Sequence, residues 1–68
     1  MTIRTLATFL KKDATIQIYD GETLVETTTP ERILDSDDIF YMLSVIRQLD
    51  NDDVGTFTVN LQNEEARA

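Results

Sequence analysis

The chain has 68 residues, contains neither cysteine nor histidine, and carries a formal net charge of −7. A chain of this length forms one domain at most, and it buries only about 60% of the surface that its unfolded form exposes, so we expect marginal stability. Without cysteine and histidine it has no disulfide framework, no Cys/His zinc site and no histidine base for nucleophilic catalysis. The composition therefore predicts a cytoplasmic, non-enzymatic protein that needs no cofactor and no metal and acts by binding.

The first twelve residues differ in charge from the rest of the chain. Arg4, Lys11 and Lys12 all precede the first acidic residue, Asp13. These basic residues interrupt the apolar ones, so the segment lacks the continuous apolar region of a targeting peptide, and no stretch of the chain approaches the length of a membrane span. We interpret the three charges as a solvated face that balances the acidic body, rather than as a basic contact patch.

The body of the chain is strongly acidic. Residues 13–68 hold thirteen acidic residues against three basic ones, a net charge of −10. A field of that sign repels phosphate backbones, so direct nucleic-acid binding is disfavoured, and it attracts basic surfaces of other proteins, including those that hold DNA or RNA. The alternative is that the acidity serves only solubility.

Residues 3–12 have the spacing of a short helix. Ile3, Leu6, Ala7 and Leu10 recur at helical intervals, and Thr2 is a candidate N-cap. As a strand, the same segment separates polar from apolar residues less well. The pattern therefore favours a helix that ends at the lysine pair.

An Asp-Gly pair at positions 20 and 21 predicts a hairpin. It lies between two β-rich runs, 15–19 and 23–27, and Asp-Gly accepts the positive φ values of a two-residue type I′ turn. That turn places Ile18 opposite Thr23 and Ile16 opposite Val25, on the side that faces the core. A longer loop shifts the register and buries Leu24 instead, and this alternative stays open.

The best helical pattern follows Pro30, which ends the second strand and begins a single helical turn at 31–34. Ser36 is a candidate N-cap for a second helix with an apolar stripe of Ile39, Met42, Leu43, Ile46 and Leu49. The alternative is that residues 44–50 form a strand, because Val45 and Leu49 also alternate with polar neighbours.

The third strand is predicted at 56–61, where Phe57, Val59 and Leu61 alternate with polar residues after a turn-rich break at 50–55. The resulting fold class is α+β: a single domain over residues 1–61 in the order α-β-β-α-β, with a three-stranded sheet packed on one or two helices, and a frayed tail at 62–68. The predicted core is Ile3, Leu6, Leu10, Ile16, Ile18, Val25, Ile39, Leu43, Ile46, Leu49, Phe57, Val59 and Leu61.

Six aspartates form the candidate partner-binding site, in two groups. Asp35, Asp37 and Asp38 lie at one end of the second predicted helix, and Asp50, Asp52 and Asp53 lie at the other, roughly 22 Å away if residues 37 to 52 are helical. Neither group is a catalytic candidate, because a raised carboxyl pKa needs a desolvated pocket that so small a chain can hardly build. A calcium loop starting at residue 50 lacks the oxygen ligands required at residues 54 and 61, which favours a plain turn.

Apolar side chains exceed what one face of the second predicted helix can bury. Phe40, Tyr41 and Met42 adjoin its apolar stripe, and Val45 widens it further. At least one large apolar side chain is therefore expected at the surface, and aromatic residues and Met are enriched at interface cores. We predict self-association through Phe40, Tyr41 and Met42, with a foreign partner as the alternative.

Two functions follow from these patterns. The first is an acidic inhibitor that blocks a basic nucleic-acid-binding surface of a partner protein as a nucleic-acid mimic. Small cysteine-free acidic proteins of phages and mobile elements, such as the anti-CRISPR inhibitors of host nucleases, share this general composition. The second is a structural or accessory module that forms a homodimer through the apolar helix face. Neither function involves a membrane or a small-molecule substrate.

Overall fold

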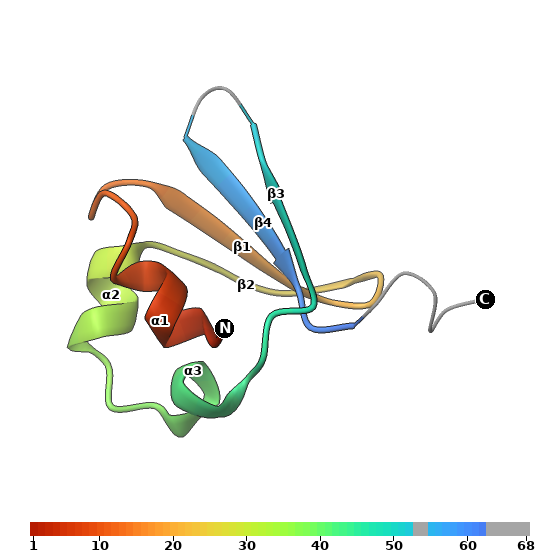
Figure 1. Cartoon of the computed structure of the whole chain (residues 1–68), viewed down its shortest axis with the longest axis horizontal. Helices are drawn as coiled ribbons and strands as arrows, with labels where there is room; N and C mark the ends of the chain where they lie inside the picture. Colours follow the sequence, from red (N-terminus) through yellow and green to blue (C-terminus); the bar gives the residue numbers. More distant parts are fainter. Residues whose placement is uncertain (53–54, 63–68) are drawn as a thin grey trace.

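The computed structural model describes residues 1–52 and 55–62 and confirms a small α+β fold (Figure 1). Its elements are α1 (Ile3–Ala7), β1 (Thr15–Asp20), β2 (Thr23–Thr28), α2 (Pro30–Asp35), α3 (Ile39–Leu43), β3 (Gln48–Asn51) and β4 (Thr56–Asn60). The predicted count of three strands and the order α-β-β-α-β are wrong, because residues 30–35 form a helix of their own, α2, and a fourth strand, β3, takes the place of the second half of the long helix. In the described part of the chain, no helix is both long and apolar enough to cross a membrane.

The four strands form one sheet in the order β2-β1-β4-β3. The two central strands, β1 and β4, are parallel, with Ile16 beside Phe57 and Ile18 beside Val59, and each outer strand is antiparallel to its neighbour. The three helices gather on one side of this sheet (Figure 1). A two-layer arrangement results, in which one face of the sheet is covered and the other is open.

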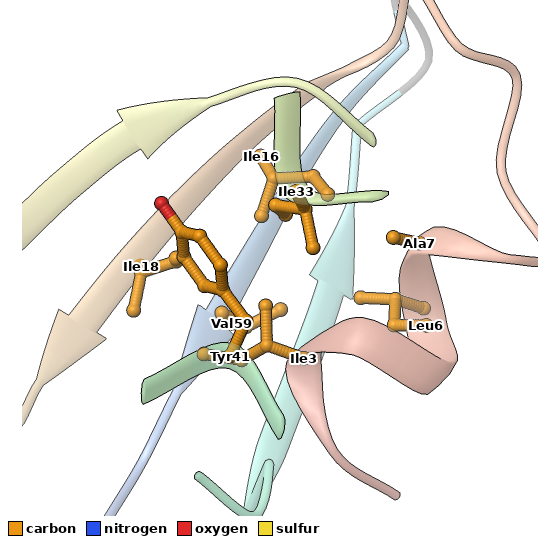
Figure 2. Packing of buried hydrophobic residues seen from close by; sticks show 8 residues of the cluster. All are labelled: Ile3, Leu6, Ala7, Ile16, Ile18, Ile33, Tyr41 and Val59. Carbon is orange, nitrogen blue, oxygen red and sulfur yellow. The ribbon is translucent and has the colours of Figure 1, made fainter. Parts of the chain in front are cut away.

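The core lies between the sheet and the helices. Figure 2 shows its eight buried side chains, which come from β1, β4 and all three helices: Ile3, Leu6, Ala7, Ile16, Ile18, Ile33, Tyr41 and Val59. Leu10, Phe40, Ile46 and Leu61 are partly buried against this cluster. Five of the residues predicted for the core are therefore buried, whereas the predicted core did not include the other three, Ala7, Ile33 and Tyr41.

Helix α1 is shorter than its sequence pattern predicted. Thr2 caps it as expected, since the Thr5 amide donates to the Thr2 hydroxyl at 3.2 Å, but the helix ends at Ala7. The Thr8 hydroxyl donates to the Thr5 carbonyl at 2.6 Å, which satisfies a carbonyl of the last turn. Lys11 and Lys12 consequently lie in the exposed loop before β1 and not at the helix end.

The β1–β2 hairpin has a different turn and register from those predicted. Gly21 has φ +70°, but the other central residue, Glu22, has no positive φ, which excludes the type I′ turn. Asp20 pairs with Thr23 and Ile18 with Glu26, and the register shift between Ile18 and Tyr19 leaves Val25 as an extra residue of β2. Val25 is 47% exposed, and Leu24, the alternative core residue, is exposed as well.

The side chain of Asn60 holds the turn of this hairpin against β4. The Gly21 amide donates to Asn60 Oδ1 at 3.0 Å, and Asn60 Nδ2 donates to the Gly21 carbonyl at 2.9 Å. The positive φ of Gly21 favours glycine at this position, and a Cβ there would lie 3.3 Å from Gln62 Oε1, so the end of the Gln62 side chain would have to shift slightly. Gln62 also donates to Asp20 Oδ1, so the first residue of the predicted frayed tail is hydrogen-bonded; residues 63–68 lie outside the described part.

The single long helix predicted from Ile39 to Leu49 is wrong, and its alternative is correct in part. Helix α3 ends at Leu43, where Ser44 takes an extended conformation. Val45 then forms an antiparallel bridge with Thr2, and the chain continues into β3. Consecutive β-branched residues at 45 and 46 favour an extended backbone, which here finds hydrogen-bond partners in the N-terminal segment. The separation of about 22 Å between the acidic groups, which assumed a continuous helix, no longer applies.

Three further residues predicted for the core, all from the predicted long helix, lie at the surface. Ile39 and Leu43 of α3 are 65% and 71% exposed, and Leu49 of β3 is 45% exposed. The helix is rotated so that Tyr41 and Phe40 face the core in place of the predicted stripe.

The hairpin register predicts that truncating Ile18 and truncating Val25 lower the free energy of unfolding by different amounts. Ile18→Ala removes a side chain with no exposed surface and should lower the free energy of unfolding by about 2–5 kcal/mol, whereas Val25→Ala should change it by less than about 0.5 kcal/mol. Urea unfolding followed by circular dichroism measures both. Equal losses for the two variants would show that β2 pairs without the extra residue.

Candidate protein interface

The outer face of α3 carries several exposed apolar side chains. Ile39 and Leu43 are four residues apart and lie on the same side of the helix, and Met42 beside them is also exposed. Met1 and Val45, from the two segments joined by the β-bridge after α3, add two more exposed apolar side chains. We call these five residues the α3 patch: Met1, Ile39, Met42, Leu43 and Val45.

Hydrogen bonds fix both ends of this short helix. Asp38 is the N-cap and accepts from the Phe40 amide at 2.9 Å, while the Ser36 hydroxyl accepts from the Asp38 amide at 3.0 Å. After the helix, the Ile3 amide donates to the Ser44 carbonyl at 3.2 Å and the Ile46 amide donates to the Met1 carbonyl at 2.8 Å. The patch is therefore held in place by backbone contacts on both sides.

The segment before α3 is tied to α1 by one arginine. Arg4 Nη1 donates to the carbonyls of Ile33 and Ser36, at 3.5 Å and 3.2 Å. These carbonyls lie at the end of α2, where a helix leaves its acceptors without intrahelical partners. Arg4 therefore serves the fold, and it positions the loop that carries the first acidic group.

Tyr41 faces inward, opposite the exposed face of α3. Its hydroxyl donates to Glu26 Oε2 on β2, and its ring lies 5.7 Å from that of Phe40, centroid to centroid. Burial and, after it, the nearby Glu26 carboxylate raise the pKa of Tyr41 from 10.0 to about 12. The hydrogen bond to Glu26 gives the buried hydroxyl a partner and joins α3 to the outer strand β2.

The three residues predicted for self-association thus have different positions. Tyr41 is buried, Phe40 is partly buried against the core, and Met42 is exposed. Ile39 and Leu43 are more exposed than Met42, but the sequence pattern had assigned both to the core. Self-association itself stays a prediction, and any surface for it on α3 centres on Ile39, Met42 and Leu43.

The acidic residues of the candidate site fall into two separate groups. Asp35 is the last residue of α2, and Asp37 and Asp38 lie in the loop between α2 and α3; all three are exposed immediately before Ile39, and we call them the acidic loop. Asp50 and Asp52 are exposed at the far end of β3, which Figure 1 shows at the opposite end of the molecule from this loop. Asp53 lies outside the described residues.

Some of these aspartates have structural roles besides their charge. Asp38 caps α3, and Asp52 Oδ1 accepts from the Thr56 amide at 2.9 Å across the turn between β3 and β4. No three Asp, Glu, His or Cys side chains within residues 1–52 and 55–62 lie close enough together to hold a metal ion. The acids that lie next to the α3 patch are those of the acidic loop.

An open cavity of about 680 Å³ lies at the other end of the molecule, between the end of α1 and the tips of β3 and β4. Its wall combines Lys11 with Asp13 and Asp52, and it includes the aromatic rings of Phe9 and Phe57. Because opposite charges share this wall, the cavity favours neither an anionic nor a cationic ligand.

No protein-family model, curated protein or solved structure matches the chain, so the proposals below rest on geometry.

The Tyr41–Glu26 pair predicts a specific pH dependence. Because the pKa of Tyr41 is raised in the folded state, its contribution to stability is fully present below pH 10.0 and is lost as the pH rises toward about 12. Tyr41→Phe should lower the free energy of unfolding at neutral pH by about 1–2 kcal/mol and reduce the decline above pH 10.0.

Urea midpoints measured across this pH range test the prediction. Tyr19→Phe is the matched control, because Tyr19 lies on the open face of the sheet, next to Ile18 in an alternating strand. A Tyr41→Phe variant that keeps the full alkaline decline would contradict the assignment.

Proposed function

We propose that this protein is a non-enzymatic interaction protein that binds a partner protein through the α3 patch, with the acidic loop contacting basic residues around the partner's apolar contact surface. The observation that carries the proposal is the exposure of Ile39 and Leu43 on a helix that is fixed at both ends. The absence of cysteine supports a cytoplasmic setting for this interaction.

The apolar part of the surface supports a binding role on energetic grounds. Full burial of a Leu, Ile or Met side chain contributes roughly 1.5–3 kcal/mol, and three such residues are exposed on one turn and a half of α3. Contiguous exposed apolar surface is uncommon on monomers and typical of interaction sites. Since the helix is already fixed by its cap and by the β-bridge, its binding requires little further ordering.

The charge of the acidic loop favours a foreign partner over a second copy. Interfaces in a twofold dimer are built from the same residues on both chains, so a dimer through the α3 patch would bring two acidic loops toward one interface. A partner with Lys or Arg around an apolar centre instead forms pairs of opposite charge with Asp35 and Asp37. Charge complementarity thus favours a basic partner.

The nucleic-acid mimic predicted from the sequence is the specific case in which this basic surface normally holds DNA or RNA. An inhibitor of that kind, as phages use, would occupy the surface with the acidic loop and anchor itself through Ile39 and Leu43. The two acidic groups lie at opposite ends of the molecule, which supports a mixed apolar and acidic contact more than a continuous row of charges.

Substitution of the patch separates this proposal from its alternatives. The double variant Ile39→Ser and Leu43→Ser should weaken partner binding at least tenfold, since the loss of two apolar anchors exceeds 1.4 kcal/mol. Leu24→Ser, an exposed leucine on β2, is the matched control and should retain the partner.

The partner is first captured from a lysate on the wild-type chain, identified by mass spectrometry, and then purified and titrated by calorimetry. Asp35→Asn with Asp37→Asn should weaken binding and reduce its salt dependence; Asp38 is left intact because it caps α3. Light scattering of the free protein provides the decisive contrast. A salt-resistant dimer that the double serine variant dissociates would replace this proposal with the homodimeric module.

A further inference from the structure

The outer edge of β3 is a second surface that the proposed function does not use. In the order β2-β1-β4-β3, β3 is an edge strand, and within the described residues no segment pairs with its outer side. Figure 1 shows β3 and β4 extending beyond the helices, so no helix covers this edge at its tip. Edge strands offer backbone donors and acceptors to any additional strand unless proline, lysine, a bulge or a covering segment blocks them.

The pairing of β3 with β4 determines which backbone groups point outward. Gln48 pairs with Asn60 and Asp50 with Thr58, and the Asp52 amide donates to the Thr56 carbonyl at 3.0 Å. In an antiparallel ladder, the amides and carbonyls of every second residue point toward the same neighbouring strand, so those of residues 48, 50 and 52 point toward β4. The amides and carbonyls of Leu49 and Asn51 therefore point away from the sheet.

The side chains of β3 alternate between the two faces. Leu49 is beside Val59, which is fully buried on the helix face, so Leu49 lies at the margin of the core and is half exposed. Asp50 is beside Thr58 on the open face and is exposed. A strand added at this edge would thus meet an apolar residue on one face and a carboxylate on the other.

The charge of Asp50 disfavours a second copy of the chain as that strand. If Leu49 pairs with Asn51 of a copy, the two Asp50 side chains lie directly opposite each other in a close, non-hydrogen-bonded pair. If Leu49 pairs with Leu49 of a copy, Asn51 meets Arg47, whose amide already donates to the Asn60 carbonyl at 2.8 Å. The first register therefore places two Asp50 carboxylates in repulsive contact. The second leaves one hydrogen bond between the two strands unformed, because the Arg47 amide already has a partner.

We infer that the outer edge of β3 binds an extended segment of a partner protein as a fifth strand, with a Lys or Arg of that segment opposite Asp50 and an apolar residue opposite Leu49. Such a segment alternates apolar and basic residues, because successive side chains of a strand face opposite sides. Main-chain bonds to Leu49 and Asn51 supply affinity, and the Asp50 pair supplies selectivity. This inference is independent of the α3 patch.

A titration of the full chain with a synthetic peptide tests the inference by NMR. The probe alternates valine and lysine and has blocked ends; the comparison peptide alternates valine and glutamate. We expect the valine–lysine peptide to slow hydrogen exchange of the Leu49 and Asn51 amides. Asp50→Asn should weaken its binding about two- to fivefold, and Asp50→Lys should reverse the preference between the two peptides.

Substitutions at Glu31 control for non-specific attraction between a basic peptide and an acidic protein. Glu31 is exposed on α2, and Glu31→Gln and Glu31→Lys match the charge changes made at Asp50. Equal effects at the two positions, or binding without protection of Leu49 and Asn51, would overturn the inference. Protection that grows with protein concentration in the absence of peptide would identify a second copy as the added strand, against the inference. Shifts confined to residues 39–43 would also contradict it and would assign the peptide to the α3 patch.

Discussion

The fold depends on the backbone contact between the first three residues and the segment that follows α3. Two main-chain bonds, from Ile3 to Ser44 and from Ile46 to Met1, enclose the bridge between Thr2 and Val45. This contact replaces the next turn of helix α3, because Val45 and Ile46 take extended conformations and pair with the N-terminus. The same contact leads the chain into the fourth strand of the sheet and brings Met1 and Val45 beside the end of α3. Both proposed surfaces, the α3 patch and the β3 edge, arise from it.

Much of the framework could be predicted from local sequence signals. The cap at Thr2, the turn near Gly21 and the alternation around Val59 each act over a few residues, and the structure contains the helix, hairpin and strand that they indicate. What failed depended on long-range contacts. The apolar stripe of Ile39, Leu43 and Leu49 is compatible with a helix, and the β-branched pair at 45 and 46 is the local signal against it; the strand-like pairing that ends the helix involves Thr2, more than forty residues earlier.

The candidate site, too, could be predicted from the sequence only in part. The acidic residues and a surplus of apolar side chains near residue 40 were evident from the sequence, but which side of α3 is buried was not. Tyr41 takes the inner position because Glu26 of β2 accepts its hydroxyl, and Glu26 reaches the inner face only through the extra residue at Val25. A bulge in one hairpin thus decides which residues another element exposes, and no pattern within residues 36–50 contains that information.

The amide of Asn60 has a consequence for the alignment of the two central strands. It donates to and accepts from the backbone of Gly21, as a neighbouring strand would, although it is a side chain. If β4 slid along β1 by two residues so that Thr58 took the place of Asn60, all faces of the sheet would keep their polarity, since side chains alternate with a period of two. The hydroxyl of Thr58 would then approach the turn, and it lacks the planar donor and acceptor pair of an amide. The side chain of Asn60 therefore helps to fix the register of β1 and β4. It stabilises the native alignment over this slipped one, which the hydrophobic pattern of the strands alone would not disfavour.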